Sequence, residues 1–208
     1  MDRYVTVKNE SFCESVISRS RFISQCFPVE SEEEALARLA EVRSNYPDAS
    51  HTCYAYRVGA RGETARFSDA GEPSGTAGMP IFEVLRTNEV TYALCAVTRY
   101  FGGVLLGTGG LARAYGGGAA EALRLAGRVE RVPAILFDLR MDYARFAALE
   151  GYLRKAARID GVDYGADVLA RAAVPDGEAE AFAARVTELS FGRVKPERRG
   201  EVFVEREF

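Results

Sequence analysis

The order of strand-like and helical segments near the C-terminus constrains the fold more than any other feature of this sequence. Apolar alternation is typical of strands, and Phe146, Leu149 and Leu153 recur at helical spacing. We expect Asp176 to cap the second helix. The predicted segments are a strand (134–142), a helix (143–159), a hairpin (161–175), a helix (176–190) and a strand (194–208). This βαββαβ order predicts a ferredoxin-like domain.

The first 130 residues combine strands and helices in a different order. Ser31 and Glu34 form a capping-box pattern at the start of a helix. The most apolar predicted strand, 91–101, is expected at the centre of its sheet. The predicted strands are 4–8, 12–18, 21–29, 51–58, 63–69 and 91–101, and the predicted helices are 31–45, 80–87 and 111–127. We place the domain boundary in 127–133, so the predicted domains are 1–130 and 131–208. Because both contain strands and helices, we predict an α+β protein.

The last helix of the first domain contains the glycine run 116–118. Each glycine inside a helix costs up to about 1 kcal/mol relative to alanine. Close packing against another backbone would explain the run, and a break in the helix is the competing interpretation.

Composition excludes several classes of protein. A net charge of −3 argues against a large basic face for duplex nucleic acid but leaves room for a local basic patch. The single histidine, His51, and four cysteines without a C-x-x-C pair predict buried reduced thiols, no metal site and no cofactor. The polar, alternating N-terminus and the lack of a long apolar run predict a cytoplasmic protein with no membrane partner.

Glycine is concentrated in two loops that carry the candidate site. Eleven of the twenty glycines lie between Gly71 and Gly118, where loops 68–80 and 102–110 each lead into a helix. Free N–H groups at a helix start bind anions, and an arginine can bind a phosphate through two hydrogen bonds. Tight turns and close packing are the alternative explanation. The predicted ligand-binding residues are Ser74, Gly75, Thr76, Arg99, Gly102, Gly103, Gly110 and Arg113, and the predicted loop-bracing residues are His51, Asp69 and Glu72.

Known catalytic and nucleotide motifs fit poorly. In a P-loop alignment of residues 102–108, Thr108 stands where the lysine belongs, and residues 107–112 match the dinucleotide fingerprint only in a variant form. No G-x-S-x-G elbow surrounds Ser74. We therefore predict no catalytic residues. Near the C-terminus, Lys195, Arg198 and Arg199 fit either a charged edge strand or a contact with RNA phosphates.

Five ordered blocks make the sequence resemble the IMPACT/YigZ family. The blocks are SRFI (20–23), YPDASH (46–51), SDAGEPSGTAG (68–78), TRYFGG (98–103), and LG, GGL and RAY within residues 106–115. The resemblance implies a first domain like the second domain of ribosomal protein S five and a second like the last domain of elongation factor G. It also implies a translation-related role and supplies no established catalytic residues. One departure is that residues 16–19 (VISR) lack the lysines common before the SRFI block.

Three hypotheses follow for the function. The preferred one is a non-catalytic, translation-associated protein that contacts RNA or ribosome phosphates, or a protein partner, through the glycine-rich loops. The second is a small-molecule enzyme or sensor that binds a phosphorylated metabolite in the same loops. The third is that the unusual residues are purely architectural. The sequence does not determine the oligomeric state.

Overall fold

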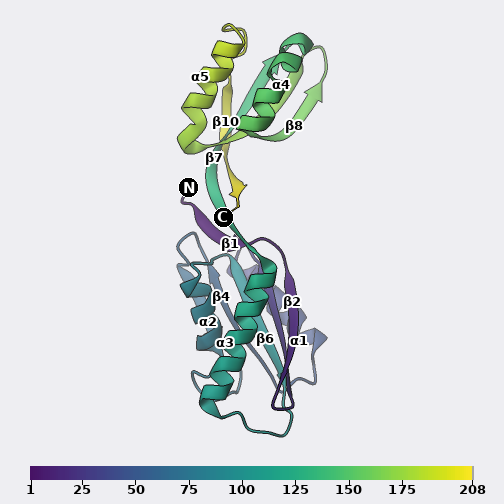
Figure 1. Cartoon of the computed structure of the whole chain (residues 1–208), viewed down its shortest axis with the longest axis vertical. Helices are drawn as coiled ribbons and strands as arrows, with labels where there is room; N and C mark the ends of the chain where they lie inside the picture. Colours follow the sequence, from purple (N-terminus) through teal and green to yellow (C-terminus); the bar gives the residue numbers. More distant parts are fainter. Residues whose placement is uncertain (208) are drawn as a thin grey trace. The chain divides into compact units, whose positions relative to one another are not determined.

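A computed structural model describes residues 1–207 as two compact units (Figure 1). The N-terminal unit comprises Tyr4–Glu130 with Glu207, and the C-terminal unit comprises Met1–Arg3 with Arg131–Arg206. Each unit packs helices on an antiparallel sheet, so the expected two-domain α+β fold is confirmed. Among the helices of residues 1–207, none is both long enough and apolar enough to cross a membrane.

The N-terminal unit is built on a five-stranded antiparallel sheet of order β2-β3-β6-β4-β5. Strand β6 is central, as its apolar sequence predicted, and its residues 93–99 are all buried. The elements of the unit are β1 (Tyr4–Val7), β2 (Ser11–Ile17), β3 (Ser20–Pro28), α1 (Glu32–Asn45), β4 (His51–Val58), β5 (Thr64–Ser68), α2 (Gly78–Thr87), β6 (Ala93–Tyr100) and α3 (Gly107–Ala126).

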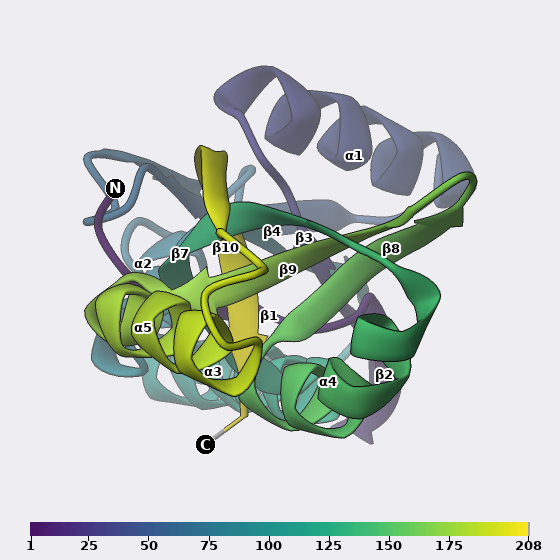
Figure 2. The same cartoon turned by 90° about the horizontal axis from the view of Figure 1, so that it is seen from above.

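Helices cover both faces of this sheet (Figure 2). Side chains of a strand point alternately to opposite faces. Accordingly, Cys95 and Val97 of β6 join the core under α2 and α3, whereas Leu94 and Ala96 join the core under α1. Both faces of β6 are therefore buried, and the end of this strand is fixed between layers.

The strand register determines which residues meet at the end of the sheet. Arg99 of β6 lies opposite Phe22 of β3 on one side and opposite His51 of β4 on the other. Three segments that are far apart in sequence thus meet at one end of the sheet. Loop 69–77 follows β5 directly, and residues 101–106 connect β6 to the start of α3.

The predicted helix starts are partly corrected. Ser31 accepts a hydrogen bond from the N–H of Glu34 (3.1 Å), as the capping box requires. The Glu34 carboxylate, however, accepts from the N–H of Glu30 (2.7 Å). Helix α3 begins at Gly107, four residues before the predicted start, so Gly110 lies in its first turn.

The C-terminal unit has the predicted ferredoxin-like arrangement. Strands β7, β9 and β8 lie in that order and β10 pairs with β7, so the first and third strands of the βαββαβ unit are side by side. The elements are β7 (Arg128–Met141), α4 (Tyr143–Ala156), β8 (Arg158–Tyr164), β9 (Val168–Pro175), a 3₁₀ turn (Asp176–Glu178), α5 (Ala179–Leu189) and β10 (Glu197–Arg206).

Two local predictions for the C-terminal part were incomplete or wrong. The strand predicted to begin at residue 134 begins at Arg128, so residues 128–133 are the first part of β7. The two units still divide within this stretch, between Glu130 and Arg131. Asp176 does not cap α5, because the 3₁₀ turn intervenes and Glu178 takes the cap position without a side-chain hydrogen bond. The short polar sequence 176–178 is equally compatible with a 3₁₀ turn and with the first turn of an α-helix.

The glycine run 116–118 does not break α3, which is continuous to Ala126. A Cβ at Gly118 would lie 2.3 Å from Oγ of Ser24, on the sheet beneath, whereas a Cβ at Gly117 would meet nothing within 4 Å. Close packing therefore explains Gly118, and the space on the outer side of the helix leaves Gly117 unconstrained.

These neighbouring glycines make a matched stability test. We expect Gly117→Ala to stabilise the protein by up to about 1 kcal/mol, because alanine has the better helix propensity. Gly118→Ala should cost about 1–3 kcal/mol by overpacking. Adding Ser24→Ala should recover most of that cost. Urea denaturation of the three variants measures these differences, and equal stabilities for Gly117→Ala and Gly118→Ala would contradict the packing argument.

Candidate binding site at the strand ends

Asp69 organises the first glycine-rich loop from within. Its carboxylate accepts hydrogen bonds from the N–H groups of Gly75 through Oδ2 and of Ala77 and Gly78 through Oδ1, each at 2.9 Å. Ala77 and Gly78 form the start of α2, which no other side chain caps. The loop N–H groups that the sequence suggested for an external anion are therefore already bound to an internal one.

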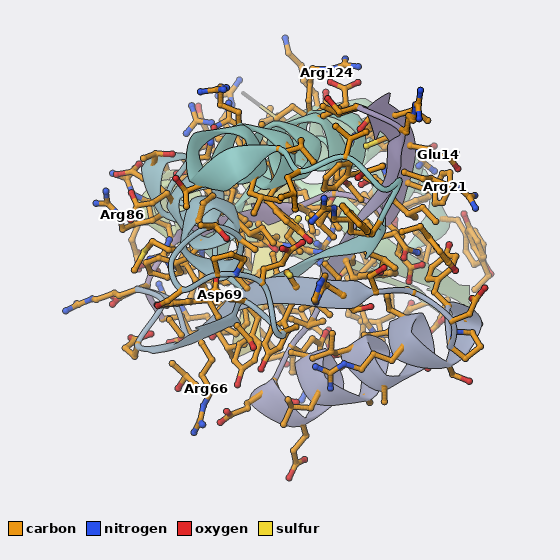
Figure 3. All side chains as sticks on the ribbon, turned by 90° about the horizontal axis from the view of Figure 1, so that it is seen from below. Glu14, Arg21, Arg66, Asp69, Arg86 and Arg124 are labelled. Atoms are coloured by element: carbon orange, nitrogen blue, oxygen red, sulfur yellow. The ribbon has the colours of Figure 1, made fainter. Side chains whose placement is uncertain are left out.

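The charge state of Asp69 follows from these contacts. Partial burial opposes its ionisation, but the backbone donors Gly75, Gly78 and Ala77 outweigh burial and hold the pKa of Asp69 below its ordinary value. In Figure 3, Asp69 lies inside the outline of the protein, whereas Arg66, Arg86 and Arg124 lie at its edge. The carboxylate thus remains charged as a permanent part of the loop.

Arg99 and Glu72 form a buried ion pair. Nη1 of Arg99 donates to Oε1 of Glu72 (2.7 Å), and their side chains are only 6% and 4% exposed. Oε1 also accepts from the hydroxyl of Tyr115 on α3 (2.7 Å). Burial is the largest cause that raises the pKa of Tyr115, and the neighbouring Cys53 and Glu72 raise it further. The hydroxyl therefore stays protonated and donates. The pair joins β6, loop 69–77 and α3.

The remaining nitrogens of Arg99 are held differently. Nη2 donates to Oγ of Ser20 (3.2 Å), which also accepts from the N–H of Gly102 (3.2 Å). The guanidinium lies 5.5 Å from the ring centre of Phe22 and 5.2 Å from that of Phe101, within cation–π range. Nε is buried and finds no acceptor among residues 1–207.

Beside the ion pair lies a cavity of about 410 Å³, here called the strand-end cavity. Its walls are mostly apolar, with Arg99, Glu72, His51 and Thr108 as the charged or polar residues. The lining residues are His51, Glu72, Pro73, Arg99, Phe101, Leu105, Leu106, Gly107, Thr108 and Leu111. Both predicted loops therefore meet in one concave site.

A second hollow of about 400 Å³, here called the α3 groove, adjoins the cavity through the shared residues Leu105 and Leu106. Its lining residues are Ile17, Ser18, Leu105, Leu106, Gly110, Arg113 and Ala114. The first turn of α3 has no side-chain cap and no acidic residue. Arg113 is exposed and makes no ion pair with any residue that the structure describes. The groove is therefore electropositive and unoccupied by a carboxylate.

Arg19 lies next to this groove. It forms the tip of the β2–β3 hairpin with Ser18, a groove residue, and both have positive φ (67° and 46°). A Cβ at Gly102 would lie 2.1 Å from the Arg19 carbonyl, so the tip packs directly against the second loop. Within residues 1–207, Arg19 makes no ion pair.

The other predicted site residues are distributed around these features. His51 forms a hydrogen bond through Nδ1 with the Ala70 carbonyl (2.9 Å), and the Thr76 hydroxyl donates to the Pro73 carbonyl (2.6 Å). Ser74 is exposed on the first loop. Gly103 is exposed on the second loop, between the cavity residues Phe101 and Leu105. Sequence reasoning missed Ser20, Tyr115, Phe101 and Arg19, whose roles depend on the register and on helix packing.

Two further groups of polar residues are accounted for. Arg198 pairs with Glu180 and Arg199 with Asp138, each at 2.7 Å, which fits a charged edge strand. Buried Cys53 donates to the Asp69 carbonyl (3.0 Å), and burial raises the pKa of its thiol to about 12. Among residues 1–207, no three His, Cys, Asp or Glu side chains are grouped to hold a metal ion.

Comparison with known proteins identifies the family. Residues 18–123 match the Impact N-terminal domain, and residues 139–193 match a domain of unknown function, DUF1949. The chain is 37% identical to IMPACT family member YvyE of Bacillus subtilis (strain 168), covering 91% of this chain and 88% of that protein. It is 38% identical to IMPACT family member YigZ of Escherichia coli (strain K12), covering 86% and 89%.

The chain belongs to the IMPACT family. A crystal structure of a hypothetical protein, 34% identical, covers 96% of this IMPACT family chain and 98% of its own, with a TM-score of 0.63. Membership of the IMPACT family supports a translation-related regulatory role at the level of the family.

Removing the Asp69 carboxylate should weaken the loop. We expect Asp69→Asn to cost about 1–2 kcal/mol at neutral pH, as loss of a helix cap does. Because the folded pKa of Asp69 is lowered, its charge stabilises the fold above the ordinary pKa of about 4 and this stabilisation is lost as pH falls through the folded value. Urea denaturation at neutral and acidic pH should show the gap between wild type and Asp69→Asn closing at low pH; a constant gap would exclude the charge as its source.

Breaking the buried pair should cost more than removing it. Glu72→Ala leaves the Arg99 charge buried without a partner, which should cost about 3–5 kcal/mol. Glu72→Ala combined with Arg99→Met removes both charges, so the double variant should be less destabilised than the sum of the single changes. A double-mutant cycle by denaturation measures this coupling, and strictly additive costs would show that the two side chains act independently.

Proposed function

We propose that this protein is a non-catalytic, translation-associated binding protein that contacts the phosphate backbone of RNA, such as ribosomal RNA, through the α3 groove. The observation that carries the proposal is the exposed Arg113, which pairs with no residue in 1–207 and lies beside the uncapped first turn of α3. The first four N–H groups of a helix lack intrahelical partners, and they favour negative charge. Family membership supports the association with translation.

Arg19 adds a second cation at the same place. Its left-handed backbone (φ 67°) is one that glycine or asparagine adopts at lower cost. The hairpin turn thus carries strain while presenting an arginine with no ion-pair partner among residues 1–207. Backbone strain of this kind is a reason to look for function at the turn.

Within this proposal the first loop has a supporting role. Gly75 donates its N–H to Asp69, and Arg99 is neutralised by Glu72, so direct contact of either with a phosphate is not favoured. Gly102 packs closely against the Arg19 backbone and thereby determines the position of the hairpin tip. The phosphate contacts then fall to Arg113, Arg19 and the N–H groups near Gly110.

A salt-titrated RNA or ribosome binding assay tests the proposal. Arg113→Gln and Arg19→Gln should each weaken binding for all RNA sequences and reduce the salt slope by about one. Arg124→Gln is the matched control, because Arg124 lies on the same helix but pairs with Glu121 (2.7 Å). Binding that is absent at low salt, or unaffected by Arg113→Gln and Arg19→Gln, rules the proposal out.

A phosphorylated small molecule is the second candidate ligand. The specific observation in its favour is that the strand-end cavity adjoins the electropositive groove, so one ligand could place a phosphate in the groove and its body in the cavity. A ligand that binds only the folded state raises the melting temperature. A panel of phosphorylated metabolites that gives no shift at saturating concentration would exclude this candidate.

A further inference from the structure

The strand-end cavity has the chemical character of a pocket for a planar, hydrogen-bonding ligand. Phe101 is 48% exposed although its ring packs against the Arg99 guanidinium, so part of the ring is available for stacking. Leu105, Leu106 and Leu111 supply further apolar wall. Ligand pockets combine such walls with a few placed polar groups.

Polar groups on the cavity wall have hydrogen-bonding capacity that the protein does not use. Arg99 and Tyr115 both donate to Oε1 of the Glu72 carboxylate, and no residue in 1–207 donates to Oε2. His51 donates from Nδ1 to the Ala70 carbonyl, because a carbonyl can only accept, which leaves Nε2 of the neutral ring as an acceptor. Nε of Arg99 also lacks an acceptor in residues 1–207, but the atom is fully buried, so we assign it no contact with a ligand.

We propose that the strand-end cavity binds one unpaired guanine base of the RNA whose phosphates occupy the α3 groove. This inference rests on the proposed function. Guanine presents N1–H and an amino group along one edge, which match the two free acceptors, Oε2 of Glu72 and Nε2 of His51. Proteins read single-stranded RNA by stacking splayed bases on aromatic or arginine planes and bonding to their edges.

Size and position support a base over an apolar protein side chain. A cavity of about 410 Å³ is ample for a purine, and it shares Leu105 and Leu106 with the groove, so a base can enter while its phosphate remains outside. An aliphatic side chain would leave the Glu72 and His51 acceptors desolvated without partners, which is costly. A donor-rich edge avoids that cost.

The test uses short oligouridylates that carry one central guanosine, inosine or abasic position. We expect the guanosine oligonucleotide to bind the full-length protein about tenfold more tightly than the abasic one, the magnitude of one stacked base. Inosine, which lacks the amino group, should bind more weakly than guanosine. Fluorescence anisotropy at low salt measures all three affinities.

Three variants assign the preference to the cavity. Phe101→Ala removes the stacking ring, and Thr108→Phe fills the cavity from an exposed position without touching the core. Both should abolish the guanosine preference and leave the salt slope unchanged. Phe12→Ala is the control, since Phe12 is 53% exposed and lies outside the cavity; it should change nothing.

The possible failures are distinguishable. Equal binding of the guanosine and abasic oligonucleotides overturns the base site and leaves the phosphate contacts of the groove standing. If no oligonucleotide binds, the proposed function fails. Ligand-observed NMR with free guanosine then decides whether the strand-end cavity binds a guanine base. Guanosine binding that Thr108→Phe abolishes keeps the base site, and absence of guanosine binding overturns it.

Discussion

The buried ion pair of Arg99 and Glu72 is the interaction on which the rest of the site depends. It joins the end of the central strand to the first glycine-rich loop, and through Tyr115 it joins both to α3. Neither charge can be exposed alone without the large cost of leaving the other buried and unpaired. The loop and the helix start are therefore held against the strand end, and the cavity and the groove owe their positions to that constraint.

The two glycine-rich segments look alike in sequence but differ physically. The first contains its own anion, because Asp69 accepts from Gly75, Ala77 and Gly78 and so caps α2. The second contains no acidic residue before or within the first turn of α3. Glycine content alone predicts N–H groups that are free to turn toward an anion. Only the position of a carboxylate decides whether that anion belongs to the protein or to a ligand.

Periodicity in the sequence was sufficient to predict most elements, the central place of β6 and the ferredoxin-like order of the last strands, because these depend on local pattern and burial. The partners of Arg99 could not be predicted, since Glu72 and Ser20 reach it only through strand register and loop closure. The reason for Gly118 was equally hidden, as it depends on Ser24 beneath the helix. The Asp176 cap failed because a 3₁₀ turn competes with a direct helix start.

The sequence blocks that carry the family resemblance also build this one end of the sheet. Ser20, His51, Glu72, Arg99 and Tyr115 come from five separate blocks and meet around the ion pair and the cavity. Residues that are buried and mutually paired are sufficiently explained by architecture, so they do not by themselves indicate a ligand. Arg113 and Arg19 are different, because they are exposed and pair with nothing in residues 1–207. The evidence for phosphate binding therefore lies in residues that the fold does not need, and the evidence for a base lies in the atoms of Glu72 and His51 that no residue in 1–207 contacts.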